Sequence, residues 1–180
     1  MAGKTPLMDQ YKKIQEQYQD SLLFFRLGRL LRKCFLYDAV TASRELELTL
    51  TGRNAGMDER APMCGVPFHS AEVYIYRLIQ KGYKVAVCEQ MEYPKTAKGL
   101  VKRDVIRVVT PGTILFENAI AEKSNNYLAY VKNREGDIAA AVADISTGEC
   151  WWGVWKQKQE NRRFSGYAFI YQPSEINLLL

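Results

Sequence analysis

Short apolar runs alternate with segments of helical periodicity along residues 1–115, and this alternation constrains the fold more than any other feature. Strands are predicted for the apolar or alternating runs, which are residues 21–27, 46–51, 84–88 and 105–109. Helices are predicted for the periodic segments, which are residues 6–18, 29–45 and 70–82. Helices that alternate with strands indicate an α/β domain.

Local signals mark several element boundaries. Thr5 before Pro6 is a typical helix start, because threonine caps the first turn and proline suits the first helical position. Gly82 favours a helix end, since glycine readily adopts the left-handed conformation. Residues 51–70 are rich in Gly, Pro, Asn and Asp, so we expect them to form a loop.

After residue 115 the pattern changes to strands without helices, and residues 116–124 are expected to form a linker. Strands of an antiparallel meander are predicted for three runs separated by turn signals, residues 126–131, 138–145 and 149–155. The tail, residues 171–180, ends on apolar side chains suited to a further strand. We therefore expect residues 125–180 to be part of a second domain that is truncated.

The composition is that of an ordinary globular protein, with 47% hydrophobic and 25% charged residues. The formal charge of +5 weakly favours polyanionic partners such as nucleic acid. Residues 1–20 lack the apolar core of a signal peptide, and no apolar run reaches membrane-spanning length. Four widely spaced cysteines without a C-x-x-C pair indicate reduced thiols. We expect a soluble cytoplasmic protein with no membrane partner.

Few residues suggest catalysis or a resident cofactor. The tripeptide at residues 3–5, GKT, resembles the end of a phosphate-binding loop but lacks the earlier glycine. His69 is the single histidine, and His69 with Cys64 would be too few ligands for a zinc site. A nucleophilic pair of His69 with Cys64 or Cys88 is conceivable, although a histidine bonded to backbone is the simpler interpretation. Glu89 follows a strand end, where active residues often lie, without an identifiable partner.

Two clusters of basic residues are the strongest functional signal in the composition. One follows the first predicted strand and contains Arg26, Arg29, Arg32 and Lys33. The other precedes and overlaps the run at 105–109 and contains Lys95, Lys98, Lys102, Arg103 and Arg107. Each cluster could be an ordinary solvated face, or the two together could contact phosphate groups, and both interpretations stay open.

Motifs along nearly the whole chain resemble the MutS family of DNA mismatch repair proteins. In family order and with family spacing, they are TPLMDQY, LLFFRLG, DAVTASRELELTLTGR, APMCGVPFHS, YKVAVCEQ, VIRVVTPGT and ADISTGE. The resemblance implies that residues 1–115 form a mismatch-recognition domain, a mixed sheet flanked by helices. It also implies that residues 125–180 begin an RNase H-like connector domain that is incomplete here.

The resemblance implies double-stranded DNA as a partner, mismatched in the parent family, with the repair factor MutL as a possible second partner. In the family, ATP and Mg²⁺ bind an ATPase domain that would lie beyond residue 180. We therefore expect no cofactor in this chain and no enzyme activity, in a cytoplasmic, nucleoid-associated bacterial protein. Family dimerisation relies mainly on later domains, so a monomer is expected.

The chain departs from the family at the segment expected to contact the mismatch. In the family, the pattern Gly-Asp-Phe-Tyr-Glu places a phenylalanine that wedges beside the mispaired base and a glutamate that hydrogen-bonds to it. Here Gly28 is followed by Arg-Leu-Leu-Arg, so an alignment without a gap puts Leu30 at the wedge and Arg32 at the glutamate. Leucine can still wedge, but it lacks an aromatic face, and arginine cannot repel matched DNA as a carboxylate can.

The stretch between Gly28 and Asp38 is also one residue longer than the family pattern. Codons for Arg-Leu-Leu-Arg, shifted by one base, can encode Asp-Phe-Tyr and the start of Glu. We hypothesise that residues 29–36 record a compensated frameshift, in the gene or in its reading.

We expect weak DNA binding with steep salt dependence and little or no mismatch preference. The residues predicted to contact DNA are Arg26, Gly28, Arg29, Leu30, Arg32, Lys33 and Arg53. Three alternatives stay open. The chain could be a nucleic-acid-binding module indifferent to sequence, an α/β enzyme that uses a thiol or His69, or a fragment that aggregates because its second core is incomplete.

Overall fold

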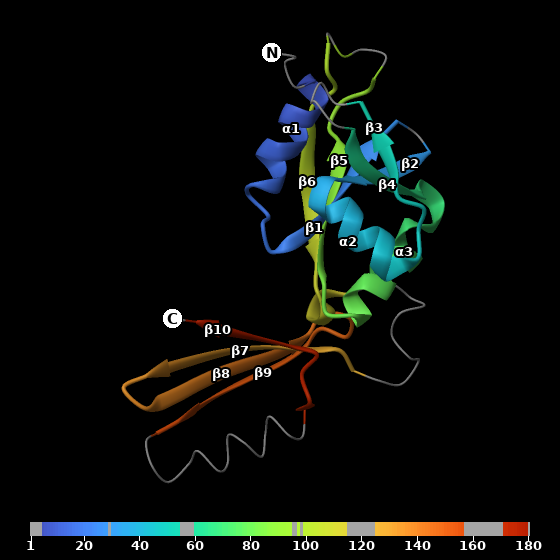
Figure 1. The fold of residues 1–180 in the computed structure, drawn as a ribbon. Coiled ribbons are helices and arrows are strands. Elements are labelled where there is room, and N and C mark those ends of the chain that lie inside the picture. Colours follow the sequence, from blue (N-terminus) through green and yellow to red (C-terminus); the bar gives the residue numbers. More distant parts are fainter. Residues whose placement is uncertain are drawn as a thin grey trace. The chain divides into compact units, whose positions relative to one another are not determined.

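The computed structural model describes residues 5–28, 30–54, 60–94, 97, 99–114, 125–156 and 171–179. The chain divides into two compact units, Met1–Val109 and Thr110–Leu180, and each is described by itself. The first unit is a sheet covered by helices on both faces, and the second is a smaller sheet (Figure 1). The first unit confirms the expected mixed α/β architecture.

A six-stranded mixed sheet forms the centre of the first unit, in the order β3-β4-β2-β1-β5-β6. Its strands are β1 (Ser21–Leu27), β2 (Leu31–Phe35), β3 (Thr51–Arg53), β4 (Ala61–Pro67), β5 (Lys84–Gln90) and β6 (Arg103–Val109). β1 pairs in parallel with β5, and the other four pairs are antiparallel. The parallel pair places the ends of β1 and β5 side by side, although the two strands are far apart in sequence.

Three α-helices cover this sheet, with α1 on one face and α2 and α3 on the other (Figure 1). They are α1 (Pro6–Gln15), α2 (Leu36–Leu46) and α3 (Ala71–Gln80), and the short 3₁₀ helix η1 (Phe68–Ser70) leads into α3. The predicted start at Thr5 and Pro6 is confirmed. Gly82 ends α3 with a φ of 85°, and its N–H donates to the Ile79 carbonyl at 2.9 Å, as its sequence position predicted.

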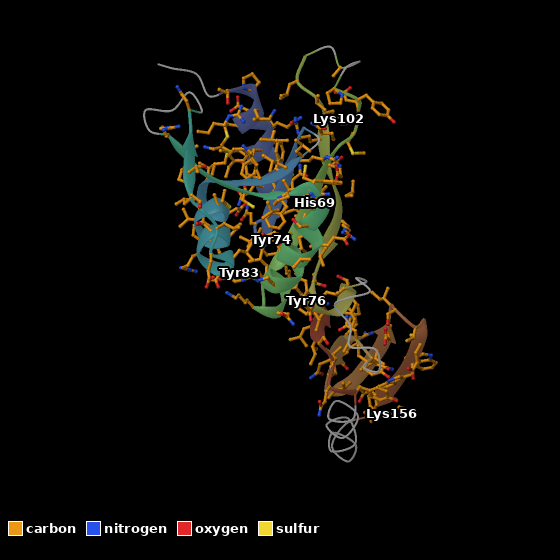
Figure 2. All side chains as sticks on the ribbon, turned by 90° about the vertical axis from the view of Figure 1, so that its right-hand side faces the viewer. His69, Tyr74, Tyr76, Tyr83, Lys102 and Lys156 are labelled. Carbon is orange, nitrogen blue, oxygen red and sulfur yellow. The ribbon has the colours of Figure 1, made fainter. Side chains whose placement is uncertain are left out.

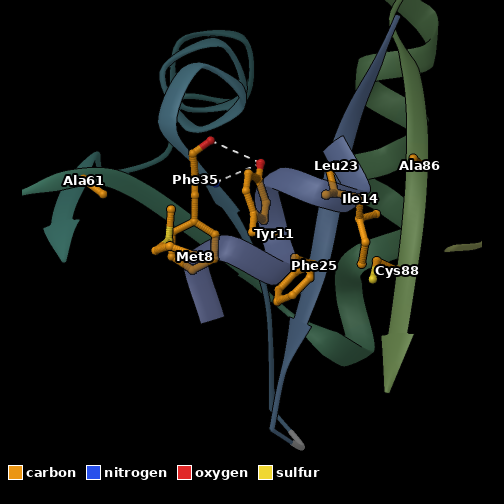
Figure 3. Packing of buried hydrophobic residues seen from close by; sticks show 9 residues of the cluster. All are labelled: Met8, Tyr11, Ile14, Leu23, Phe25, Phe35, Ala61, Ala86 and Cys88. Carbon is orange, nitrogen blue, oxygen red and sulfur yellow. Dashed lines mark hydrogen bonds between the residues drawn. The ribbon is translucent and has the colours of Figure 1, made fainter. Parts of the chain in front are cut away.

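The core under α1 joins this helix to β1, β2 and β5 through buried apolar side chains. The cluster contains Met8, Tyr11, Ile14, Leu23, Phe25, Phe35, Ala61, Ala86 and Cys88 (Figure 3). The Tyr11 ring packs edge-on against Phe25 and Phe35, with centroids 5.4 and 5.1 Å away. Its hydroxyl donates to Asp38 Oδ2 at 2.5 Å, and Asp38 Oδ2 also accepts the Leu23 N–H at 3.2 Å. A single buried carboxylate therefore ties α1, β1 and α2 together.

The prediction of a helix over residues 29–45 is wrong in its first half. Residues 31–35 are β2, whose Lys33 pairs with Phe25 of β1, and α2 begins only at Leu36. Leu30, Leu31, Cys34 and Phe35 fit helical spacing, and periodicity alone could not show that neighbouring strands claim this segment. Pairing with β1 on one side and β4 on the other overrides the local pattern.

Two further boundaries between residues 46 and 70 are wrong. The predicted strand over 46–51 is the end of α2 and a connection, and β3 begins at Thr51. The predicted loop over 51–70 contains β4, where prolines and a glycine had suggested irregular structure. In β4, Pro62 and Pro67 lie near the two ends, and Gly65 faces the Lys33 side chain, where an added Cβ would meet Cγ at 3.2 Å.

The second unit is a four-stranded sheet in the order β10-β7-β8-β9. Its strands are β7 (Tyr127–Arg134), β8 (Asp137–Asp144), β9 (Glu149–Trp155) and β10 (Glu175–Leu179). β7, β8 and β9 form the expected antiparallel meander, and the tail adds β10 in parallel beside β7. Ala140 and Val142 lie on a buried face, whereas Trp152 on the opposite face is 77% exposed. The expected linker at 116–124 lies outside the described residues.

Candidate nucleic-acid interface

The β1–β2 hairpin ends in a short turn that presents an apolar side chain to solvent. Leu27 pairs with Leu31, so residues 28–30 make the connection. Gly28 has a φ of 65°, a left-handed conformation that glycine adopts without steric cost. The Leu30 side chain is 78% exposed, and Leu31 is 38% exposed. The turn therefore carries leucine where the family resemblance places a wedge.

Behind the turn, two arginines share one carboxylate. Arg26 and Arg32 lie opposite each other on β1 and β2. Arg26 Nη1 donates to Glu89 Oε2 at 2.8 Å, and Arg32 Nη2 donates to Glu89 Oε1. Arg32 Nη1 also donates to the Cys88 carbonyl at 3.3 Å. Glu89 lies at the end of β5, which the parallel pairing brings beside the end of β1.

Phe68 covers both guanidinium groups and also fixes the turn. Its ring centroid lies 3.8 Å from Arg26 Cζ and 5.1 Å from Arg32 Cζ, within the range of cation–π contacts. Its backbone N–H donates to the Leu30 carbonyl at 2.8 Å. We call Arg26, Arg32, Phe68 and Glu89 the hairpin anchor.

Arg32 is the deepest member of the hairpin anchor. It is only 7% exposed, so its guanidinium does not face bulk solvent. Burial lowers the pKa of Arg32, and the neighbouring Glu89 carboxylate opposes that shift. The residue that an ungapped alignment puts at the family's glutamate is thus held under Phe68 by an ion pair.

Lys33 and Arg53 form a second group of positive charge near the hairpin. Lys33 follows Arg32 on β2, so its side chain emerges on the opposite face of the sheet. Arg53 is exposed on the edge strand β3. Partial burial and then the proximity of Arg53 lower the pKa of Lys33. Within the described part of the chain, neither residue forms an ion pair with a carboxylate, and Lys33 Nζ donates to Met63 Sδ at 3.4 Å.

The described members of the second basic cluster, Lys102, Arg103 and Arg107, do not form one continuous track. Arg103 is buried and donates from Nε to the Arg26 carbonyl at 2.8 Å and from Nη1 to Gln10 Oε1 at 3.0 Å. Arg107 pairs with Glu72 at 3.5 Å. Lys102 is exposed near the start of β6 (Figure 2). Lys95, Lys98 and, from the first cluster, Arg29 lie outside the described residues.

The residues considered for catalysis are not brought together. His69 lies exposed in η1, at the start of α3 (Figure 2), whereas Cys64 and Cys88 are buried. Burial raises the pKa of Cys88 to about 12, which keeps it a thiol at neutral pH. Cys64 faces Cys34 across β4 and β2, and a hydrogen bond from Cys34 lowers its pKa. No group of three potential metal ligands occurs among the described residues.

Sequence reasoning missed Phe68 and the role of Glu89 in the hairpin anchor. Glu89 was noticed only as a candidate acid after a strand. Arg32 and Glu89 lie 57 positions apart, so no local spacing could pair them. Only the folded sheet, in which β1 and β5 are parallel neighbours, brings the carboxyl ends of these strands together.

Comparison with known proteins assigns the family. The family model for MutS domain I matches residues 5–118. The chain belongs to the MutS family. It is 51% identical over 172 residues to the DNA mismatch repair protein MutS of Caldanaerobacter subterraneus subsp. tengcongensis, covering 96% of this chain and 20% of that relative.

Two further MutS relatives agree with this assignment. The MutS protein of Acetivibrio thermocellus is 58% identical over 149 residues, or 83% of this chain and 17% of that relative. That of Ruminiclostridium cellulolyticum is 54% identical over 181 residues, or 98% of this chain and 20% of that relative. The chain therefore spans about a fifth of the length of these relatives. Among its described residues, no helix has the length and apolar character that a membrane span requires.

Proposed function

We propose that this chain binds duplex DNA through the turn of the β1–β2 hairpin, with little or no preference for a mismatch. The observation that carries the proposal is the Leu30 side chain, 78% exposed at a turn that Phe68 holds by a backbone hydrogen bond. The turn belongs to the region that matches MutS domain I, and the relatives carry the name DNA mismatch repair protein.

An apolar wedge can discriminate only through the ease with which DNA deforms. Separating a base step costs a few kcal/mol, and a mispaired step loses less pairing, so it opens more readily. The exposed Leu30 can enter such a step, but it offers no aromatic face for stacking. Neither Leu30 nor Arg32 has the carboxylate that the family resemblance expects beside the base. Arg32 is instead paired with Glu89 inside the protein.

Phosphate contacts would supply most of the affinity. Lys33 and Arg53 are neighbouring cations beside the hairpin, and Arg53 is exposed on the sheet edge. Arg26, Arg29 and Arg32 were predicted to do the same, but the guanidinium groups of Arg26 and Arg32 are already paired with Glu89, so we do not count these two among the phosphate contacts. Each phosphate that a protein neutralises releases counterions, so such binding weakens steeply with salt.

The position of the extra residue decides which leucine is the wedge. Cys34 and Phe35 are buried, and Asp38 is fixed by Tyr11, so β2 cannot slip by one residue without exposing its core side chains. The connection at 28–30 has three residues, whereas two-residue hairpin turns are the commonest. If the turn contains the extra residue, Leu31 takes the place of the family's phenylalanine and Lys33 that of its glutamate.

The test is a fluorescence anisotropy titration of labelled matched and G·T duplexes over a range of salt concentrations. We expect similar affinities for the two duplexes and a steep salt dependence. Lys33→Ala with Arg53→Ala should reduce the slope of log K against log salt by about 1.8. Leu30→Ala and Leu31→Ala should leave the slope unchanged, and the residue that wedges should show the larger loss of affinity.

The matched control removes the same two charges elsewhere in the first unit, with Lys13→Ala on α1 and Arg77→Ala on α3, both exposed. This control should keep the parent slope. A tenfold preference for the G·T duplex at physiological salt would show that the site still recognises mismatches. Absence of salt-dependent binding would refute DNA binding by this chain.

The domain organisation is part of the same proposal. Residues 1–115 would be the recognition domain, 116–124 a linker and 125–180 the start of an RNase H-like connector. The four-stranded sheet of the second unit supports a strand-rich beginning of that domain. In a full-length protein, the ATPase domain with ATP and Mg²⁺, and contacts with MutL, would belong to the remaining sequence.

A further inference from the structure

The hairpin anchor places two positive charges directly behind the proposed DNA-binding turn. Besides its bond to Glu89, Arg26 donates from Nε to the Gly28 carbonyl at 3.2 Å. Phe68 contacts the next part of the turn through the Leu30 carbonyl. The positively charged groups of Arg26 and Arg32 therefore lie next to the surface where DNA would bind.

Glu89 gives the two arginines an acceptor that is chemically similar to a phosphate. A carboxylate and a phosphate both present two oxygens to guanidinium groups, so they compete for the same donors. Here Glu89 Oε2 accepts from Arg26 and Oε1 accepts from Arg32. Both carboxylate oxygens are used, and both arginines are paired within the protein.

The Arg32 side chain is more enclosed in its ion pair with Glu89 than the Arg26 side chain is. The side chain of Arg32 is 8% exposed and that of Arg26 is 22% exposed. A buried guanidinium that loses its carboxylate is strongly disfavoured, so it would move towards solvent or a new anion. Removal of the Glu89 charge should therefore release both arginines rather than leave them in place.

We propose that Glu89 is a specificity-determining residue, which holds Arg26 and Arg32 away from the DNA backbone and so limits binding that is indifferent to DNA structure. This inference rests on the proposed DNA binding by the hairpin. In the parent chain, phosphate contacts come from residues outside the hairpin anchor. Arg26, which donates to the Gly28 carbonyl, acts as a positioning residue for the turn, and Arg32 lies beneath Phe68.

The test compares Glu89→Gln with Glu45→Gln in the whole chain. Both substitutions remove one negative charge from an ion-paired carboxylate, but Glu45 pairs with Arg44 and Lys81 instead of the hairpin arginines. The readout is the slope of log K against log salt for a matched duplex. We expect Glu89→Gln to steepen the slope by about 1 to 2 and to tighten binding severalfold at low salt. Glu45→Gln should keep the parent slope.

Arg32→Met keeps the inference testable if Glu89→Gln fails to fold, as circular dichroism would show. Methionine fills the space under Phe68, and Glu89 keeps Arg26 as a partner. Because the parent Arg32 is withheld from DNA, the slope should not change. In the double variant with Glu89→Gln, only Arg26 is released, so the gain in slope should be about half.

The outcomes separate this inference from the proposed function. If the parent binds DNA and Glu89→Gln has the parent slope, the inference is wrong and DNA binding stands. A fall of about 1 in the slope of Arg32→Met would also overturn it, because Arg32 would then contact phosphate in the parent. If neither parent nor Glu89→Gln binds, both proposals fail. Binding by Glu89→Gln alone supports the inference and refutes the function proposed for the parent.

Discussion

On the face of the β1–β2 hairpin that packs against α1, the Tyr11 hydroxyl and the Asp38 carboxylate form one polar network. On the other face, Arg26, Arg32 and Glu89 form another. The first network holds a single carboxylic acid, Asp38, whose pKa is raised by burial and lowered in part by its hydrogen bonds from Tyr11 and Leu23. The second has two guanidinium groups and one carboxylate and so carries a net positive charge, and its charged side chains are 8% to 22% exposed.

The Asp38 network stabilises the fold, whereas the hairpin anchor lies behind the turn that we propose binds DNA. Asp38 is 3% exposed, and its Oδ2 accepts from both Tyr11 and Leu23. Such a satisfied buried network stabilises one arrangement of the chain. The hairpin anchor is less enclosed, and one carboxylate serves two arginines. Loss of the first network should therefore cost more stability than changes in the second, which should also alter binding.

The largest expected effect comes from Asp38→Ala. The substitution leaves the Tyr11 hydroxyl and the Leu23 N–H without their shared acceptor in the core, so we expect a loss of about 2–3 kcal/mol in the free energy of unfolding. Urea denaturation followed by circular dichroism measures it. Glu16→Ala at the exposed end of α1 is the control and should be nearly neutral. An Asp38→Ala chain as stable as the parent would contradict a stabilising role for this network.

The helices and strands of the first unit differ in how far the sequence could predict them. The start of α1 at Pro6 and the end of α3 before Gly82 follow from residues next to each other in the chain. β2 and β4 do not, because their identity as strands depends on pairing with each other and with β1. Local periodicity therefore predicted a helix at β2, and the Gly- and Pro-rich composition predicted a loop at β4.

The site shows the same division. The sequence located the turn after β1 and its basic residues, because family motifs lie on both sides, but it predicted a helix where β2 completes the hairpin. It could not assign each basic residue a role, because alternation along β2 puts the side chains of Arg32 and Lys33 on opposite faces of the sheet. Glu89 joins them only through the parallel pairing of β1 and β5. Long-range sheet topology thus decides which of these charges are paired within the protein.

A smaller effect is expected from Phe68→Leu in the hairpin anchor. Leucine keeps the backbone bond to the Leu30 carbonyl and much of the apolar volume, but it removes the ring from both guanidinium groups. Cation–π contacts contribute about 0.5–2 kcal/mol, so we expect a loss of about 1 kcal/mol in unfolding free energy. Phe68→Tyr, which retains a ring, should stay close to the parent. Equal losses for Leu and Tyr would assign the effect to packing rather than to cation–π attraction.

An effect no larger than that of Phe68→Leu is expected from Gly28→Ala in the turn itself. A Cβ at Gly28 would have no heavy atom within 4 Å, so the substitution causes no clash. The cost then comes from the backbone, because a φ of 65° is disfavoured for alanine by roughly 1 kcal/mol. Gly28→Asn should lose less, since asparagine tolerates this conformation better. Urea denaturation of both variants measures the difference. A loss of several kcal/mol in the alanine variant would mean that the turn is packed against the rest of the chain, contrary to the open space around Gly28. The turn would then contribute to stability as the buried Asp38 network does, and the two faces of the hairpin would not differ in their roles.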